Sequence, residues 1–168
     1  MFSGDNLKSI KNFGKEFVGG GAQTFEEARE NSKKAGKLLA HFLTSNFLTK
    51  GQTITFIGFS LGTQLIRSTL NRMQKLGRSD IVHNVYLTAG ATIIRLKKEG
   101  KLFESLAQVV NGRIVNVYTE NDTTLAFFQA YYRDNAIGRT VIFHRHPSNL
   151  SSKVDGVKIA RIDNYDVS

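Results

Sequence analysis

Apolar and polar residues follow two distinct patterns along most of the chain, one typical of helices and one typical of strands. Apolar residues that recur at intervals of three and four predict helices over residues 25–46, 61–76, 92–110 and 124–132. Short runs rich in β-branched and aromatic residues predict strands over residues 53–58, 82–88, 113–119, 140–143 and 157–163. Strands that alternate with helices are typical of an α/β fold, a mostly parallel sheet flanked by helices.

The first helix carries a sequence signal for its start. Thr24, followed three residues later by Glu27, predicts a capping box. Helical spacing places five residues on one face, which supports the helix prediction; they are Ala28, Ser32, Ala35, Leu39 and Phe42. We therefore expect two parts, a basic N-terminal segment at residues 1–23 and a partial α/β-hydrolase-like domain at residues 24–168.

The N-terminal segment has an amphipathic pattern of its own. Leu7, Ile10, Phe13 and Phe17 recur near helical spacing, with lysines between them, and three glycines follow. A helix packed on its own domain is the preferred interpretation. The alternative is a helix that lies on a membrane or on a partner.

Composition narrows the range of functions. The chain has 168 residues, no cysteine and a formal net charge of +9. These features fit one intracellular domain, cytoplasmic or mitochondrial and not secreted, without disulfides or thiolate metal sites. Its basic residues are scattered without the interleaved aromatics of a nucleic-acid reader, so no nucleic-acid partner is expected. Most of the charge is interpreted as solvated surface, and an acidic or membrane-surface partner is the alternative.

The stretch "FIGFSLGTQL" at residues 56–65 carries the strongest chemical signal. Ser60 lies in a Gly-x-Ser-x-Gly pattern, after strand formers and before helix formers. This order is typical of a nucleophile elbow, in which Gly58 and Gly62 avoid collisions across a tight turn. The backbone N–H of Leu61 would then face a developing oxyanion. The alternative is an ordinary strand-to-helix turn.

An activated serine needs an acid and a base. Asp122 follows the strand at 113–119 and is the preferred acid; it could equally cap the next helix, and Glu120 is the nearby alternative. His144 and His146 follow Asp122 in the chain order of α/β-hydrolases and are weak candidates for the base, with a basic surface loop as the preferred interpretation. No ligand spacing predicts a metal site, and no glycine-rich pattern predicts a nucleotide or another cofactor.

Several ordered segments resemble the transmembrane and coiled-coil domain-containing protein 4 family of lipase-like α/β-hydrolases. They are "SKKAGKLLAHFL", "ITFIGFSLGTQLI", "HNVYLTAGA", "GRIVNVYTENDTTLAFF" and "VKIARIDNYDVS". The resemblance covers about residues 24–168 and implies Ser60 as nucleophile and Asp122 as acid. Thr123 stands where the family usually has an aromatic residue.

The departures from this family shape the expected function. The family's catalytic histidine follows the last strand in a Gly-His motif, and its second oxyanion donor comes from strands upstream of the elbow. Neither part is expected in this sequence. The preferred function is therefore a lipase-like module that is non-catalytic on its own, a pseudoenzyme that serves as a structural subunit. The alternative is a serine esterase or lipase that takes both parts from missing sequence or a partner chain.

The same departure predicts an exposed sheet edge. The elbow strand at 53–58 should lack its upstream neighbour, and no charged residue or proline protects it. We expect another polypeptide, or a second copy of the chain, to cover this edge by donating a strand.

Overall fold

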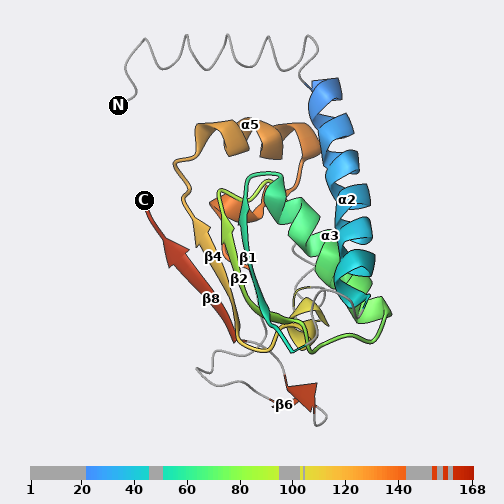
Figure 1. Ribbon diagram of the computed structural model, residues 1–168. Helices are drawn as coiled ribbons and strands as arrows, with labels where there is room; N and C mark the ends of the chain where they lie inside the picture. The colour runs from blue at the N-terminus through green and yellow to red at the C-terminus, as the bar shows by residue number, and fades with distance from the viewer. Residues whose placement is uncertain are drawn as a thin grey trace, which may run out of the picture.

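A parallel sheet forms the centre of the molecule. The computed structural model describes residues 22–45, 51–94, 103, 105–142, 153–154, 157–158 and 161–168. The sheet has the order β1-β2-β4-β8, and every neighbouring pair is parallel (Figure 1). Its strands are β1 (Ile54–Phe59), β2 (Val82–Thr88), β4 (Arg113–Tyr118) and β8 (Arg161–Asp166). The predicted α/β class with a mostly parallel sheet is confirmed.

Helices cover one face and one end of this sheet. Their bounds are Ala22–Thr44 for α2, Gly62–Lys75 for α3 and Thr123–Tyr132 for α5. Helix α3 packs on the sheet and α2 packs on α3, whereas α5 crosses above the ends of the strands (Figure 1). The main core lies between α3 and the sheet and includes Ile66, Leu70, Met73, Val85 and Ile114.

Short elements complete the described fold. Two antiparallel pairs join β3 to β5 and β6 to β7. Their bounds are Ile93–Ile94, Asn135–Ala136, Lys153–Val154 and Val157–Lys158, and the 3₁₀-helices are η2 (Ala107–Val109) and η3 (Ile137–Arg139). The predicted helix at 92–110 is wrong at its start, where β3 lies, and the predicted strand at 157–163 divides into β7 and β8.

The predicted strand at 140–143 is also wrong over its described part, because residues 140–142 lie in no strand. Side-chain amides take the place of a strand partner here. The Asn116 amide donates to Thr140 O at 3.0 Å, and Asn164 Oδ1 accepts from Ile142 N at 2.8 Å. The Asn164 amide also donates to Ile142 O at 3.3 Å. These bonds satisfy the backbone without a ladder.

Helix α2 differs from its sequence prediction in two ways. It already begins at Ala22, so Thr24 lies inside the helix and cannot act as its N-cap. The face that the sequence pattern groups together is also not the buried one, because Phe42 is 58% exposed. The buried side is formed instead by Gly36, Ala40 and Leu43. A Cβ on Gly36 would lie 2.3 Å from Leu65 O, so this glycine permits the close approach of α3.

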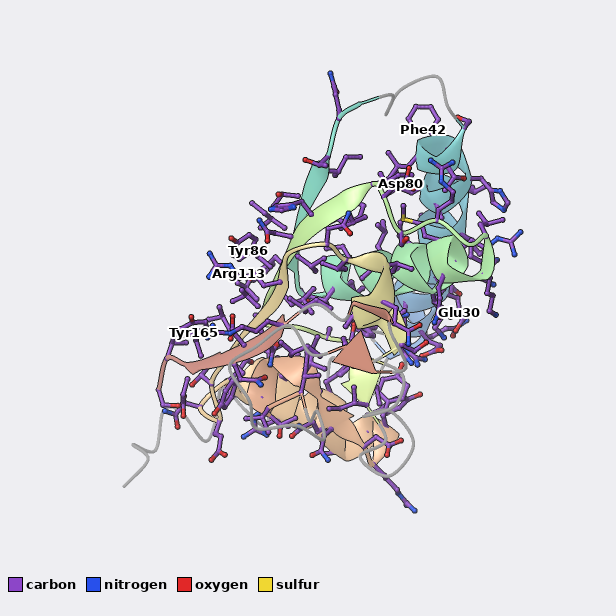
Figure 2. The ribbon with its side chains drawn as sticks, turned by 90° about the horizontal axis from the view of Figure 1, so that it is seen from below. Glu30, Phe42, Asp80, Tyr86, Arg113 and Tyr165 are labelled. Atoms are coloured by element: carbon purple, nitrogen blue, oxygen red, sulfur yellow. The ribbon has the colours of Figure 1, made fainter. Side chains whose placement is uncertain are left out.

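The sheet face opposite α3 carries exposed apolar side chains on β1. Gly58 faces Ile66 of α3, so its neighbours Ile57 and Phe59 project to the other face. They are 78% and 69% exposed. Tyr86 and Tyr165 lie on the same face by strand register, and Figure 2 shows them on the side away from α2. No helix among the described residues covers this face.

Candidate active site

Ser60 lies at a strained turn between β1 and α3. Its φ is +50°, a left-handed conformation that residues with a Cβ rarely adopt. Its N–H donates to Thr88 O of β2 at 3.1 Å, and its carbonyl accepts from Thr63 N at 3.1 Å and Ala91 N at 3.2 Å. Three backbone hydrogen bonds therefore hold the turn in a conformation that a nucleophile elbow requires.

Side chains beneath the turn hold it further. Thr63 Oγ1 donates to Ser60 O at 2.6 Å and lies 2.9 Å from Thr92 Oγ1, and both threonines are buried. Thr88 Oγ1 donates to Gly58 O at 3.2 Å. The sequence did not reveal these supports, because Thr63 and Thr92 meet only after the chain has folded. They restrict movement of the Ser60 backbone.

The two glycines of the motif differ in their surroundings. A Cβ on Gly58 would lie 2.5 Å from Ile66 Cδ1 and 3.2 Å from the Gly62 carbonyl group. A Cβ on Gly62 would meet nothing within 4 Å. The expected collision across the turn therefore applies to Gly58 and is wrong for Gly62.

Leu61 has the position expected of an oxyanion donor. It is the N-cap of α3, and its φ and ψ are −65° and −17°. No hydrogen bond within the described part of the chain uses its N–H, whereas its side chain packs against the cluster that includes Leu125 and Phe128 of α5. A free N–H at a helix N-terminus is suited to stabilise negative charge.

Asp122 lies at the same end of the sheet as Ser60. Both follow the carboxyl ends of parallel strands, β4 and β1, with β2 between them. Two interstrand spacings separate those strands by roughly 10 Å. Asp122 is also the N-cap of α5, since its Oδ1 accepts from Leu125 N at 2.8 Å. Within the described residues its Oδ2 has no hydrogen bond, so one carboxylate oxygen caps the helix and the other is available.

Glu120, the other acid that the sequence left open, is fixed through its backbone. The Glu120 carbonyl oxygen accepts a hydrogen bond from Arg139 Nε at 3.1 Å, and Glu120 is exposed to solvent. Arg139 also donates to Gln129 of α5 at 2.8 Å. These contacts tie the loop before Asp122 to α5 and η3.

Helix α5 is anchored above this end of the sheet by aromatic contacts with α2. The rings of Phe25 and Phe128 meet edge to face with centroids 4.4 Å apart. The Tyr132 hydroxyl donates to Glu26, and Arg29 lies 4.9 Å above the Tyr132 ring. Burial and the hydrogen bond to Glu26 raise the pKa of Tyr132 above its ordinary value.

No histidine of the described part lies at this end of the sheet. His83 is the second residue of β2 and lies near the opposite end from Ser60. His41 is exposed on α2, and its Nε2 accepts from Arg72 Nε at 2.9 Å. His144 and His146 lie outside the described residues. The structure therefore brings Ser60, Leu61 and Asp122 to the carboxyl end of the sheet, without a histidine among the described residues there.

A family model matches residues 22–168, which is most of the chain. The chain belongs to the family described as "Protein of unknown function (DUF726)". The transmembrane and coiled-coil domain-containing protein 4 family, to which the sequence showed a narrower resemblance, stays a prediction. No solved structure matches the chain.

The relatives of this DUF726 member are much longer proteins. It is 34% identical over 98 residues to "Uncharacterized membrane protein C6F6.13c" of Schizosaccharomyces pombe. This alignment covers 58% of the chain and 12% of that protein. The chain is 37% identical over 93 residues to "Probable lipase MIL1" of Saccharomyces cerevisiae, an alignment that covers 55% of the chain and 8% of that protein. It is 33% identical over 99 residues to "Transmembrane and coiled-coil domain-containing protein STS1" of Oryza sativa, at 58% and 14% coverage.

The matched segments thus cover less than a fifth of the length of each of these relatives. The relative from Schizosaccharomyces pombe has the words "membrane protein" in its name. In the described part of this chain, no helix combines the length and apolar character needed to cross a membrane.

Proposed function

We propose that this chain is a lipase-like α/β-hydrolase module, non-catalytic on its own, that serves as a structural subunit of a larger assembly. The supporting observation is the left-handed Ser60 between β1 and α3, at the same end of the sheet as Asp122 but without a described histidine beside them. Among the described residues, the elbow has the shape of a hydrolase without the group that would accept the serine proton.

The comparisons support the lipase-like part of this proposal. One relative is named a probable lipase, and the matched family covers both the elbow and the segment around Asp122. The narrower resemblance to the transmembrane and coiled-coil domain-containing protein 4 family points to the same chemistry. Within the described residues no strand pairs with the outer side of β1, which supports the structural part because an unpaired strand is suited to join another chain.

The alternative is a serine esterase or lipase completed by other sequence or by a partner. Ser60 Oγ would attack the ester carbonyl while a supplied histidine accepts the hydroxyl proton. The Leu61 N–H would stabilise the oxyanion together with a supplied second donor. Asp122 Oδ2 would orient the histidine. The histidine would then donate the proton to the leaving alcohol, and water would release the acid from the acyl-enzyme.

Purified chain should be assayed with a short activated ester and with a fluorophosphonate probe. We expect little turnover and weak labelling, equal in wild type and in Ser60→Ala. Turnover that depends on Ser60 would overturn the non-catalytic assignment. Loss of that turnover in His146→Ala or His144→Ala, but not in His83→Ala, would identify the base.

Added imidazole tests the geometry of the Ser60 turn separately from the question of which group supplies the base. Free imidazole can accept the Ser60 proton when no histidine is present. We expect it to increase acylation of Ser60, detected by mass spectrometry, and to leave Ser60→Ala unmodified. An imidazole effect that is the same in both proteins would contradict the elbow assignment.

A further inference from the structure

A groove lies between α2 and α3 on the outer surface of the helices. Its volume is about 530 Å³. It is lined by Lys34, Lys37, Leu38, His41, Ser68, Asn71, Arg72 and Lys75. Four of these eight side chains are lysine or arginine, and none is acidic. The groove therefore presents concentrated positive charge on a chain whose net charge is already +9.

The close crossing of the two helices sets this arrangement. Gly36 allows the backbone of α2 to approach Leu65 and Ser68 of α3. The approach places Lys37 and Lys34 on the same surface as Arg72 and Lys75. Like charges so close together repel one another, so this surface is suited to an anionic partner.

The lysines of the groove are not committed to ion pairs. Elsewhere on α2, Arg29 pairs with Glu26 at 2.9 Å and Lys33 pairs with Glu30. For Lys34, Lys37 and Lys75, the described part of the chain offers no such carboxylate partner. Arg72 instead donates to His41, another residue that lines the groove, at 2.9 Å.

Two large apolar side chains adjoin these cations. Leu38 lies within the groove and is 70% exposed, and Phe42 lies one helical turn further on the same side of α2. Figure 2 shows Phe42 projecting from α2, far from Arg113 and Tyr165 on the sheet. Exposed leucine and phenylalanine beside lysines are typical of helices that lie in a membrane interface.

We propose that the α2–α3 groove binds the surface of an anionic phospholipid bilayer. The lysines and Arg72 contact headgroup phosphates, while Leu38 and Phe42 enter the boundary between headgroups and acyl chains. A free phosphate would use the cations but not the exposed apolar side chains. This surface is separate from the Ser60 edge, so the inference is independent of the proposed function.

Flotation with lipid vesicles tests the proposal on the full chain. Vesicles of phosphatidylcholine are compared with vesicles in which about a third of the lipid is phosphatidylserine. We expect binding to the anionic vesicles and little to the neutral ones. The double variant Lys34→Gln, Lys37→Gln should lose roughly 30-fold in affinity, about fivefold for each lysine.

A matched variant controls for net charge. Arg113→Gln, Arg161→Gln removes the same two charges from paired residues of β4 and β8, away from α2. We expect its affinity to stay within about threefold of wild type. Equal losses in the two double variants would overturn the proposal, because binding would then follow net charge alone. Thermal melts should show both variants folded, since all four side chains belong to exposed residues.

Phe42→Trp provides a direct report on insertion, because the chain has no tryptophan. We expect a blue shift in its emission and quenching by brominated acyl chains, with anionic vesicles only. An unshifted spectrum on bound vesicles would contradict the proposal. So would displacement by millimolar inorganic phosphate, or binding to an acidic polypeptide without binding to vesicles. Loss of vesicle binding only when Lys8, Lys11 and Lys15 are changed to Gln would assign the contact to the N-terminal segment instead.

Discussion

The exposed edge of β1 leads to a quantitative prediction about self-association. Ser60 N–H donates to Thr88 O of β2, and alternate residues of a strand direct their backbone groups to opposite sides. Thr55, Ile57 and Phe59 therefore direct their N–H and C=O groups away from β2. In the described part of the chain no strand pairs with this edge. A second copy could pair its own β1 here in an antiparallel, symmetric manner.

Ile57 is the best position for a perturbation. It is 78% exposed, so Ile57→Lys should cost the isolated chain less than about 1 kcal/mol of folding free energy. Ile57 projects from the sheet face, so a paired strand would cover only part of its side chain, and a cross-strand contact between the two copies would contribute roughly 0.2–1 kcal/mol. The lysine removes that contact, and like charges on the opposed strands repel each other and protect the edge from pairing. The dimer dissociation constant should therefore rise by roughly two- to thirtyfold.

Sedimentation equilibrium over a wide concentration range measures this constant. Tyr165→Lys on β8 is the matched control, because Tyr165 is 49% exposed on the same face at the other edge of the sheet. Strand β8 already carries Arg161, Asp163 and Asp166, which discourage pairing. We expect the control to leave association unchanged.

Hydrogen exchange provides the second measurement. The outward amides of Thr55, Ile57 and Phe59 should gain protection as concentration rises, whereas Phe56 and Gly58 should be protected throughout. The reasoning would be refuted if the chain stayed monomeric at every concentration and these outward amides were already protected in the monomer. It would mean that the chain itself covers the edge of β1.

Three further pairs of variants test the site by urea denaturation. Gly58→Ala should cost about 1–3 kcal/mol of the unfolding free energy, because its Cβ would meet Ile66 and the Gly62 backbone, whereas Gly62→Ala should be neutral or stabilise by up to about 1 kcal/mol; equal losses would contradict the assigned turn. Asp122→Ala should cost about 1 kcal/mol through loss of the α5 cap, and Asp122→Asn should not. Asn116→Ala should cost about 2 kcal/mol or more, because Ile137 O and Thr140 O lose a donor, while the exposed Asn121→Ala should change little.

Local patterns in the sequence were sufficient to predict the main strands and the turn at Ser60. Strand β2 has the predicted bounds, and β1 is displaced by one residue, because β-branched runs and glycine punctuation act over short distances. The segment at 140–143 resembled a strand equally well. Its backbone is satisfied by Asn116 and Asn164, and a contact between residues so far apart in the chain leaves no local signal.

The buried face of α2 required tertiary information. Hydrophobic periodicity favoured the side that carries Phe42, whereas the fold buries Gly36 and Ala40 against α3. Close helix packing selects small residues, and a period search that scores apolar bulk underestimates them. The consequence is that two large apolar side chains of this helix, Leu38 and Phe42, face outward, whereas Leu43 is buried.

Asp122 connects the stability of the fold with the chemistry that the site could perform. Its Oδ1 fixes the start of α5, which in turn packs through Phe128 on the cluster that holds Leu61. The cap would therefore maintain Asp122 in this chain even if no catalysis occurred, and an intact acid is weak support for an active enzyme. Ser60 differs, because a glycine would adopt its left-handed conformation with less strain. Acylation of Ser60 in the presence of imidazole therefore distinguishes a nucleophile elbow from an ordinary strand-to-helix turn, and turnover without imidazole distinguishes a working hydrolase from a structural relative.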